Sequence, residues 1–522
     1  MNNLPVDEFV APTIAWVSLL PIIIVLGGAV VAVLAEALAP VRLRRAMGIG
    51  IALVSTMGAA SVLALRWIPV AAAPQSLGEY IEDPLTLAAQ FILAVLGFFA
   101  VLVIADRSEI GDGAFAGQPS DRPGSHEEEL TDAKNYQRTE IFSLVLFSLG
   151  GMMVFPAANS FIALFVALEV MSLPLYILAA TARRRRQLSQ EAALKYFLLG
   201  AFASGFMLMG SALLYGFSGS LTITQVATAI PSMVNMDWLL FIGVFMVMVG
   251  LLFKVGAAPF HAWTPDVYTG APTPVTGFMA AAVKVAAFAA MLRFYQVVAG
   301  ALQWELSWVL VGIAALTMLV GTFAGLVQTD IKRMLAYSSI AHAGFILLGV
   351  FSLVQGSSGN VLFYLLTYGL ATVGAFGVVS LVRRQDSEGA IGAEVTDFTR
   401  WSGLGRTNPV VAGAFLVFLL SFAGIPLTAG FIGKFVVFAD AFAGGWGYLV
   451  GLALACSAVT AFFYFRVVRV LFFEEPTGEV VIVRSEGLST VAIIVAALGT
   501  IVLGLFPAPV LSLLNQVVVL LP

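Results

Sequence analysis

Residues 249–292 read VGLLFKVGAAPFHAWTPDVYTGAPTPVTGFMAAAVKVAAFAAML, and its two apolar runs each carry a lysine, Lys254 and Lys284. A charge at mid-bilayer costs at least about 2.5–3.5 kcal/mol, so lysines in such runs are rare and usually functional. Gly256 and Pro259 interrupt the first run, and proline removes a backbone donor. Backbone groups freed at membrane depth need protein partners or a wet cavity. The stretch therefore predicts a transmembrane helix broken beside a charge, which is typical of ion paths.

The composition of the whole chain agrees with a membrane protein. Of 522 residues, 60% are apolar and 11% are charged, against about 25% charged in a soluble domain. Mean hydropathy is +0.98 and the net charge is −4, so no basic surface is available for nucleic acid. The single cysteine, Cys456, excludes a disulfide framework and a cysteine-ligated metal or iron–sulfur cluster. Composition thus excludes a soluble enzyme, a disordered protein and a nucleic-acid binder.

Apolar runs long enough to span a bilayer recur along the chain. A span needs roughly 20 apolar residues, and the sequence predicts an all-α polytopic membrane protein of about 14 transmembrane helices. The predicted ranges are 13–38, 46–68, 84–105, 140–156, 159–181, 189–216, 237–260, 272–299, 305–327, 331–353, 358–382, 408–440, 446–473 and 488–506.

Lysine and arginine set the predicted orientation. With the N-terminus outside, twenty of these residues fall in inside loops and only Arg66 and Arg293 fall outside. Cytoplasmic loops carry the excess of positive charge. The bias predicts a multi-pass membrane protein with both termini on the outer side.

The four remaining cations and one acid lie inside predicted spans: Glu169, Lys195, Lys254, Lys284 and Lys434. Lys195 is six residues into its span, and a lysine near a helix end can reach the interface instead. For the other four a functional role is expected, because ionisable residues inside a membrane are rare and are usually functional. The alternative is a buried glutamate–lysine pair that only fixes helix packing.

A second broken helix is predicted at 408–440, where Gly424 and Pro426 precede Lys434. The breaks occupy the seventh and twelfth spans, the fourth place in each of two successive units of five. Five is odd, so the second unit enters the membrane from the opposite side, as in an inverted repeat. The predicted division is an N-terminal three-helix segment with a polar loop at 1–139, repeats at 140–299 and 300–473, and a C-terminal helix and tail at 474–522.

Lysine and glutamate can hold and release protons, so Glu169, Lys254, Lys284 and Lys434 predict a proton path bridged by water. His342 is expected between Lys284 and Lys434, or else as a hydrogen-bonded core histidine. Tyr337, Ser338 and Ser339 on its helix would order bridging waters. His261, with Asp266 five residues on, fits a gating or proton-entry loop or a helix cap. Two ligands without a third do not make a metal site.

No energy source is visible in the chain. Moving one charge against 100 mV costs about 2.3 kcal/mol, and the sequence has no nucleotide motif, no redox ligand set and no phosphate-binding loop. The energy is expected from a partner or from another ion gradient.

Two long stretches, PFHAWTPDVYTGAPTPVTGF at 259–278 and KRMLAYSSIAHAGFILLG at 332–349, closely resemble signatures of the antiporter-like subunits of respiratory complex I. The resemblance covers Glu140 to about Phe473. The family carries a glutamate on its fifth helix and lysines on its sixth, seventh and eighth, which match Glu169, Lys195, Lys254 and Lys284. M-type subunits usually carry glutamate where Lys434 stands, and L-type subunits carry a lateral helix beyond the last spans. Both points favour the N-type group.

The resemblance implies a large assembly with the M and L subunits, the small subunits K, J, A and H, and a peripheral redox arm. FMN, iron–sulfur clusters, NADH and quinone would be held by those partners, and no cofactor by this chain. Three alternatives stay open from the residues: a cation/proton antiporter or membrane hydrogenase subunit, a stand-alone solute transporter, and a structural scaffold. Co-purifying chains, solute uptake and apolar replacement of the lysines would separate them.

Overall fold

The computed structural model describes residues 14–108, 113–117, 125–133, 140–183, 185–232, 236–352, 354, 356–385, 391–476 and 478–519. Within these residues, twelve helices are long and apolar enough to cross a membrane, and two shorter apolar helices cover Ile141–Ala157 and Pro409–Ala423. The predicted helical membrane fold is confirmed, and each of the fourteen predicted ranges overlaps one of these helices. The exact number of crossings, the inverted repeats and the segment boundaries stay predictions.

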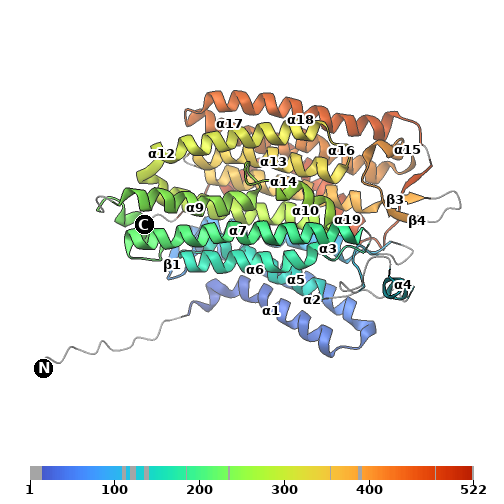
Figure 1. Cartoon of the computed structure of the whole chain (residues 1–522), viewed down its shortest axis with the longest axis horizontal. Helices are drawn as coiled ribbons and strands as arrows, with labels where there is room; N and C mark the ends of the chain where they lie inside the picture. The colour runs from blue at the N-terminus through green and yellow to red at the C-terminus, as the bar shows by residue number, and fades with distance from the viewer. Residues whose placement is uncertain are drawn as a thin grey trace.

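The long helices lie side by side in one bundle (Figure 1). In chain order they and the short elements between them are α1 (Trp16–Leu38), α2 (Val41–Ala72), α3 (Pro84–Ala105), α4 (His126–Ala133), α5 (Ile141–Val154), η1 (Phe155–Ala157), α6 (Phe161–Ala179), α7 (Arg186–Ser218), α8 (Ile223–Ala229), α9 (Asp237–Val255), α10 (Trp263–Gly270), α11 (Thr273–Phe278), the π-turn η2 (Met279–Val283), α12 (Lys284–Leu326), α13 (Ile331–Phe351), α14 (Ser357–Leu381), η3 (Phe398–Arg400), α15 (Leu404–Thr407), α16 (Pro409–Ala423), α17 (Ala429–Ala443), α18 (Gly447–Phe473), α19 (Leu488–Leu505) and α20 (Ala508–Leu514).

Short polar side chains fix where several helices begin. Asp83 accepts a hydrogen bond from the Thr86 amide at the start of α3, and Asp330 accepts one from the Arg333 amide at the start of α13. Such caps satisfy backbone donors that have no partner within the helix. The starts of these spans are therefore set by the local sequence.

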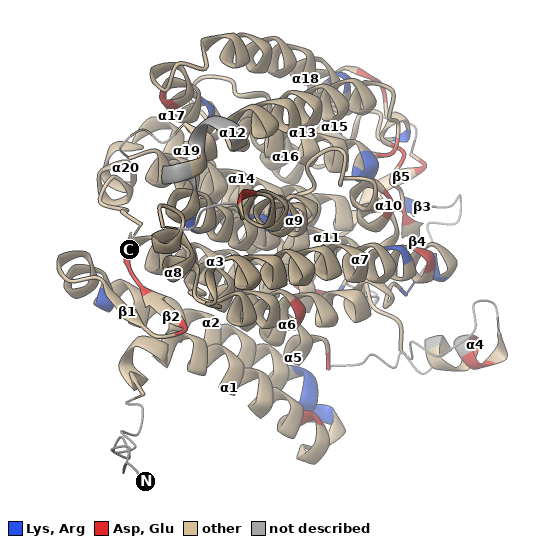
Figure 2. Ribbon diagram, turned by 60° about the vertical axis from the view of Figure 1, so that its left-hand side comes forward, with Lys and Arg blue, Asp and Glu red and all other residues tan. Residues whose placement is uncertain are grey.

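The core of the bundle is formed by the helices that carry the predicted site. Every residue of the most apolar window of Thr273–Val298 is buried, and α13 and α14 are 94% buried in theirs. By contrast α2 and α19 are only 33% buried, which is consistent with a lipid-facing or partner-facing position. The charged residues gather mainly at helix ends and in loops (Figure 2).

Helix α12 joins two predicted spans without a loop. Its backbone leaves helical geometry only at Leu302, with φ −120° and ψ 17°. This kink lies between the predicted spans 272–299 and 305–327, so α12 consists of two helices that meet at Leu302.

Two small sheets, which an all-α prediction does not include, cap opposite ends of the bundle (Figure 1). One is the antiparallel hairpin of β1 (Gln75–Leu77) and β2 (Tyr80–Glu82). The other has the order β4-β3-β5, with β3 (Val382–Gln385) between β4 (Ile391–Glu394) and β5 (Val480–Ile482). Pairing of β3 with β5, Arg383 opposite Val481, brings together loops about 100 residues apart in sequence. The strands are too short to show an alternating pattern in the sequence.

A buried ion pair holds the N-terminal helices against the first predicted repeat. Arg293 on α12 donates to both carboxylate oxygens of Asp83, at 2.9 and 2.7 Å, and also to the carbonyl of Pro156 and the hydroxyl of Thr86. The two side chains are 2% and 0% exposed. Bidentate geometry and the extra hydrogen bonds offset the cost of burying both charges.

Candidate proton path

The first lysine of the predicted path lies at the end of α9. Lys254 Nζ donates to the Ser172 hydroxyl of α6 at 2.7 Å, and it lies 5.3 Å from the ring centre of Tyr196 and 5.6 Å from that of Tyr176. Ring faces attract a cation. The ammonium is therefore held by a hydroxyl and aromatic rings, all neutral.

Glu169 lies on α6, three residues before Ser172, and is half-buried. Among the described residues it forms no ion pair with Lys254 within 4.0 Å. The predicted pair is therefore not a direct contact in this structure. Since residues three apart share a helix face, Ser172 stands on the same side of α6 as Glu169, where it receives the lysine.

The helix break follows directly after Lys254. Helix α9 ends at Val255, and Gly256 adopts φ +75°, a conformation that favours glycine. The Ala257 amide then donates to the Leu252 carbonyl at 3.0 Å, a Schellman closure of the helix end. Pro259 lies exposed in the connection that leads to α10.

Lys284, at the start of α12, reaches this helix end. Its Nζ donates to the Val255 carbonyl at 3.0 Å and to the Ser339 carbonyl of α13 at 2.6 Å. It also lies 5.8 Å from the ring centre of Tyr368. The ammonium thus binds the last carbonyl of α9, at the negative end of that helix.

The second break has the same construction. Helix α16 ends at Ala423, Gly424 has φ +78°, and the Ile425 amide donates to the Leu420 carbonyl at 3.0 Å. Pro426 is exposed in the connection to α17. At both breaks, the first half of the helix therefore ends at a glycine. The last carbonyls of that half need hydrogen-bond donors from other segments.

Lys434 on α17 satisfies the carbonyls of the second break. Its Nζ donates to the carbonyls of Phe422 and Ala423 at 2.8 and 3.1 Å and to the Ser457 hydroxyl at 2.8 Å. A cavity of about 420 Å³ adjoins Lys434 and Ser457 between α17 and α18, lined largely by phenylalanines. Lys434 is consequently the member of the path nearest to an opening on the side of the bundle.

His342 is buried on α13 among aromatic residues. Its Nδ1 lies 2.7 Å from the Tyr364 hydroxyl, and its Nε2 lies 3.4 Å from the Tyr464 hydroxyl, which bonds Ser338. The ring packs 4.9 Å from that of Tyr368, the neighbour of Lys284, and 5.8 Å from that of Phe422, whose carbonyl holds Lys434. The structure thus places His342 between the two lysines, within a hydrogen-bonded cluster.

Lys195 belongs to a different group at the ends of the helices. It is 43% exposed and pairs with Glu191 at 2.7 Å and with Asp266 of α10 at 2.8 Å. Arg333 of α13 holds the other oxygen of Asp266 at 2.9 Å. Burial alone would raise the pKa of Asp266, but the hydrogen bonds from Lys195 and Arg333 outweigh it and hold the pKa below its ordinary value. Tyr337 lies beside Arg333, so it faces this ion cluster.

His261 lies in the connection between α9 and α10, half-buried, with an Nδ1 that has no hydrogen-bond partner among the described residues. Burial lowers its pKa, so the imidazole is neutral near pH 7. In the part of the chain that the structure describes, no three His, Cys, Asp or Glu side chains gather as metal ligands.

The sequence did not indicate the groups that contact the buried lysines and His342. These are the hydroxyls of Ser172, Ser457, Tyr364 and Tyr464 and the rings of Tyr176 and Tyr196. One signal was available, the spacing of Ser172 and Tyr176 at three and seven residues after Glu169. The others lie on separate helices and come together only through packing.

Comparison with known proteins identifies the family. The model of the NADH:quinone oxidoreductase/Mrp antiporter transmembrane region matches residues 158–460. NADH-quinone oxidoreductase subunit N of Beutenbergia cavernae is 53% identical, with 98% of this chain and 99% of the relative aligned. The subunit N of Saccharopolyspora erythraea is 47% identical, over 97% of this chain and 98% of the relative.

Solved structures have the same fold. A chain of respiratory complex I from Thermus thermophilus with bound Aureothin is 34% identical, with TM-score 0.77, over 95% of this chain and all of that one. A chain of the Mrp complex from Dietzia sp. DQ12-45-1b, 20% identical over 96% of this chain and 97% of that one, shares the fold with TM-score 0.79. The chain belongs to the NADH:quinone oxidoreductase/Mrp antiporter transmembrane family, and within it to the subunit N group of NADH-quinone oxidoreductases.

Proposed function

We propose that this chain is a proton-translocating subunit in the membrane arm of an NADH:quinone oxidoreductase, and that protons move along Glu169, Lys254, Lys284, His342 and Lys434. Family membership supports the first part. The second part depends on one observation. The three buried lysines, here the lysine row, are Lys254, Lys284 and Lys434, and among the described residues they are hydrogen-bonded to hydroxyls and carbonyls and to no carboxylate.

A buried ammonium without a counter-ion is costly to keep charged. Each member of the lysine row is 5% exposed or less, so its protonation state depends strongly on the charges around it. Approach of the Glu169 carboxylate to Lys254 would favour the protonated lysine, and its withdrawal would release the proton. Because Ser172 holds Lys254 meanwhile, the lysine keeps its position when the carboxylate leaves.

From Lys254 the proton passes to Lys284 across the end of α9. Lys284 binds the carbonyl of Val255, the residue that follows Lys254. Both lysines therefore lie at the C-terminal end of α9. Beyond Lys284, Tyr368 and the His342 cluster lead to Phe422 and Lys434. A neutral imidazole has one donor and one acceptor nitrogen, so His342 can receive a proton on one side and give it up on the other.

The redox chemistry that drives transport belongs to partner subunits. FMN, iron–sulfur clusters, NADH and quinone are expected there, and the neighbours in the membrane arm are expected to be the M and L subunits and the small subunits K, J, A and H. The chain would lie in the bacterial cell membrane with both termini on the outer side.

The test uses the intact complex in native membranes and in proteoliposomes. Lys254→Ala and Glu169→Ala should each lower NADH-driven proton pumping several-fold, with the complex still assembled on native gels. Lys195→Ala is the matched control, because Lys195 is half-exposed and paired outside the lysine row. Normal pumping with either Lys254→Ala or Glu169→Ala would refute the path. A loss with Lys195→Ala as large as with Lys254→Ala would place Lys195 in the path as well.

A further inference from the structure

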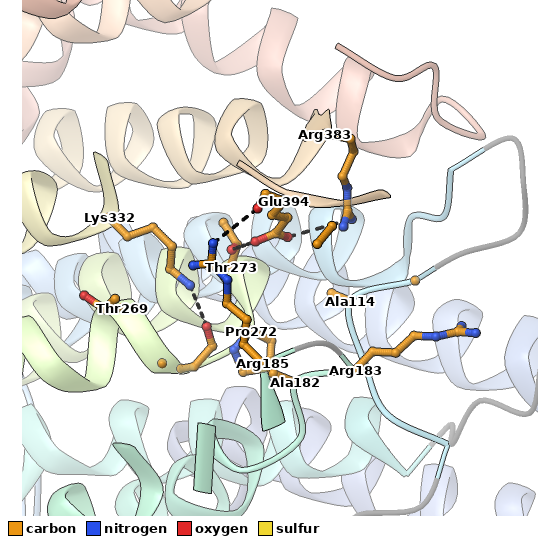
Figure 3. Close-up of a pocket in the computed structure, with 14 residues that line it drawn as sticks. Ala114, Ala182, Arg183, Arg185, Thr269, Pro272, Thr273, Lys332, Arg383 and Glu394 are labelled. Carbon is orange, nitrogen blue, oxygen red and sulfur yellow. Dashed lines mark hydrogen bonds and ion pairs between the residues drawn. The ribbon is translucent and has the colours of Figure 1, made fainter. Parts of the chain in front are cut away.

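A small polar cavity opens at the end of the bundle that carries β3 and β4 (Figure 3). Its lining includes Arg185, just before α7, together with Thr273 of α11, Lys332 of α13, Arg383 of β3 and Glu394 of β4. The four cations that line it, these three and Arg183, lie outside the transmembrane helices or at their ends, on the side that the charge bias predicts to be cytoplasmic. No residue of this cavity was expected to be functional from the sequence.

The arginines of the cavity are engaged within the protein. Arg185 donates to the Thr396 hydroxyl at 3.0 Å and to the Glu394 carbonyl at 3.4 Å, and Arg383 lies 3.8 Å from the Glu394 carboxylate. Arg183 points away from Glu394 and Lys332 (Figure 3). The arginines therefore fix β4 in place and are not collected around a vacant anion site.

Besides the arginines, the ionisable groups that line the cavity are Glu394 and Lys332. Glu394 Oε2 accepts a hydrogen bond from the Thr273 hydroxyl at 2.6 Å, and its side chain is 18% exposed. Lys332 is 3% exposed, and its Nζ donates to the carbonyl of Ala271 at 2.7 Å. One carboxylate thus faces one ammonium across the entrance to α11 and α13.

The volume of the cavity limits which molecules can fit inside it. Its volume is about 40 Å³, and one water needs about 10–15 Å³ by this measure, so about three waters fit. A phosphate group has five heavy atoms and its charge would meet Glu394 as well. The hollow is therefore suited to a short chain of water and not to an anionic headgroup.

The polar lining continues inward toward Lys284. Ser339 lies seven residues after Lys332 on α13, which is about 10 Å along a helix. It is 1% exposed, its hydroxyl lies beside the hydroxyls of Tyr268 and Tyr368, and its carbonyl accepts from Lys284 Nζ. The Thr276 hydroxyl, fully buried one turn after Thr273, lies 3.2 Å from the carbonyls of Tyr268 and Pro272 and donates to them. A hydroxyl that donates to a carbonyl keeps two lone pairs, which can accept from water.

We propose that Glu394 and Lys332 form the proton-uptake port of this chain, through which water delivers protons from the β3–β4 end of the bundle to Lys284. The proposal rests on the proposed proton path. Glu394 takes a proton from a hydronium ion of the solvent, which leaves a water molecule. The proton then moves through cavity water and the hydroxyls of Thr276 and Ser339 to a neutral Lys284. Glu394 returns to its ionised form, so charge and atoms balance. Lys332 positions the water and repels other cations.

The test compares Glu394→Gln with Glu479→Gln in the intact, reconstituted complex. Glu479 directly precedes β5 in the same end cap, and its side chain is 64% exposed and pairs with Arg400, so its loss should not change pumping. Glu394→Gln keeps the Thr273 hydrogen bond but cannot take up a proton. We expect the ratio of protons pumped to NADH oxidised to fall by at least a quarter with Glu394→Gln, and Glu394→Asp to restore most of it.

The outcomes separate the port from the path. Suppose that Lys284→Ala lowers the ratio of protons pumped to NADH oxidised, while Glu394→Gln and Glu479→Gln give the same ratio. The proposed port is then wrong and the proposed path stands. If Lys284→Ala also leaves it unchanged, the path itself fails. Should Glu394→Gln fail to assemble, Thr273→Val decides: it removes one hydrogen bond from the carboxylate and should still lower the ratio, and an unchanged ratio overturns the port.

Discussion

Lys284 donates to the carbonyl of Val255, the last residue of α9, at 3.0 Å. Lys434 has the same relationship to Ala423, the last residue of α16, at 3.1 Å. In each case a lysine from a following helix satisfies the carbonyls left by a glycine-ended break, at the negative end of the helix dipole. Lys284 comes from the eighth predicted span and Lys434 from the twelfth, so different members of the predicted repeats use the same contact. In both, the lysine ties proton binding to the geometry of a broken helix.

Ser172→Ala should lower proton pumping, but less than Lys254→Ala does. The replacement removes the hydroxyl that holds the Lys254 ammonium at 2.7 Å, and a hydrogen bond to a charged group contributes about 1.5–3 kcal/mol. Pumping by the reconstituted complex is the measurement. Ser61→Ala is a suitable control, because the Ser61 hydroxyl is exposed and bonds only the carbonyl one turn earlier. Equal pumping by both variants would show that Ser172 does not matter to Lys254.

Lys434→Ala should impair the second half of the path, between His342 and the side cavity. We expect pumping to fall several-fold while NADH oxidation with a water-soluble electron acceptor, which needs only the redox arm, stays normal. Ser457→Ala, which removes one of three hydrogen bonds to Lys434, should have a milder effect in the same assay. Normal proton release with Lys434→Ala would remove this lysine from the path.

Gly256→Ala should destabilise the chain and reduce the amount of assembled complex. A side chain at φ +75° costs about 1–2 kcal/mol, and its Cβ would lie 2.9 Å from the Thr264 hydroxyl oxygen. Gly216→Ala is the control, because Gly216 lies within α7 with open space around its Cβ position. Thermal unfolding and native gels of the two variants give the comparison, and equal melting temperatures would contradict the strain at Gly256.

Arg293→Ala should cost about 3–5 kcal/mol, because it leaves the Asp83 carboxylate buried and unpaired. The expected result is loss of the assembled complex at growth temperature. Arg469→Ala, which breaks a pair whose arginine is 70% exposed, should change stability by about 1 kcal/mol or less. The yield of folded subunit in detergent measures both, and comparable yields would show that the buried pair is dispensable.

Several features of this chain could be derived from the sequence because each depends on local chemistry. Apolar runs of about 20 residues give the transmembrane helices, and Gly256 and Gly424 beside lysines mark where two of them break. Glu169, Lys254, Lys284 and Lys434 stand out because charges are costly inside a membrane. The two signature stretches at 259–278 and 332–349 were specific enough to indicate the family that the comparisons establish.

The contacts that those charged residues make could not be predicted from the sequence. Nothing near Lys284 in the chain predicts the carbonyls of Val255 and Ser339, and nothing near Lys195 predicts its pairing with Asp266, 71 residues away. Likewise the cavity at Glu394 forms only where β3 and β4 meet the starts of α7, α11 and α13. Hydropathy and charge place a residue at a depth in the membrane, since they follow from the residue itself. Which group meets it there depends on how the helices pack, and only the tertiary structure decides that.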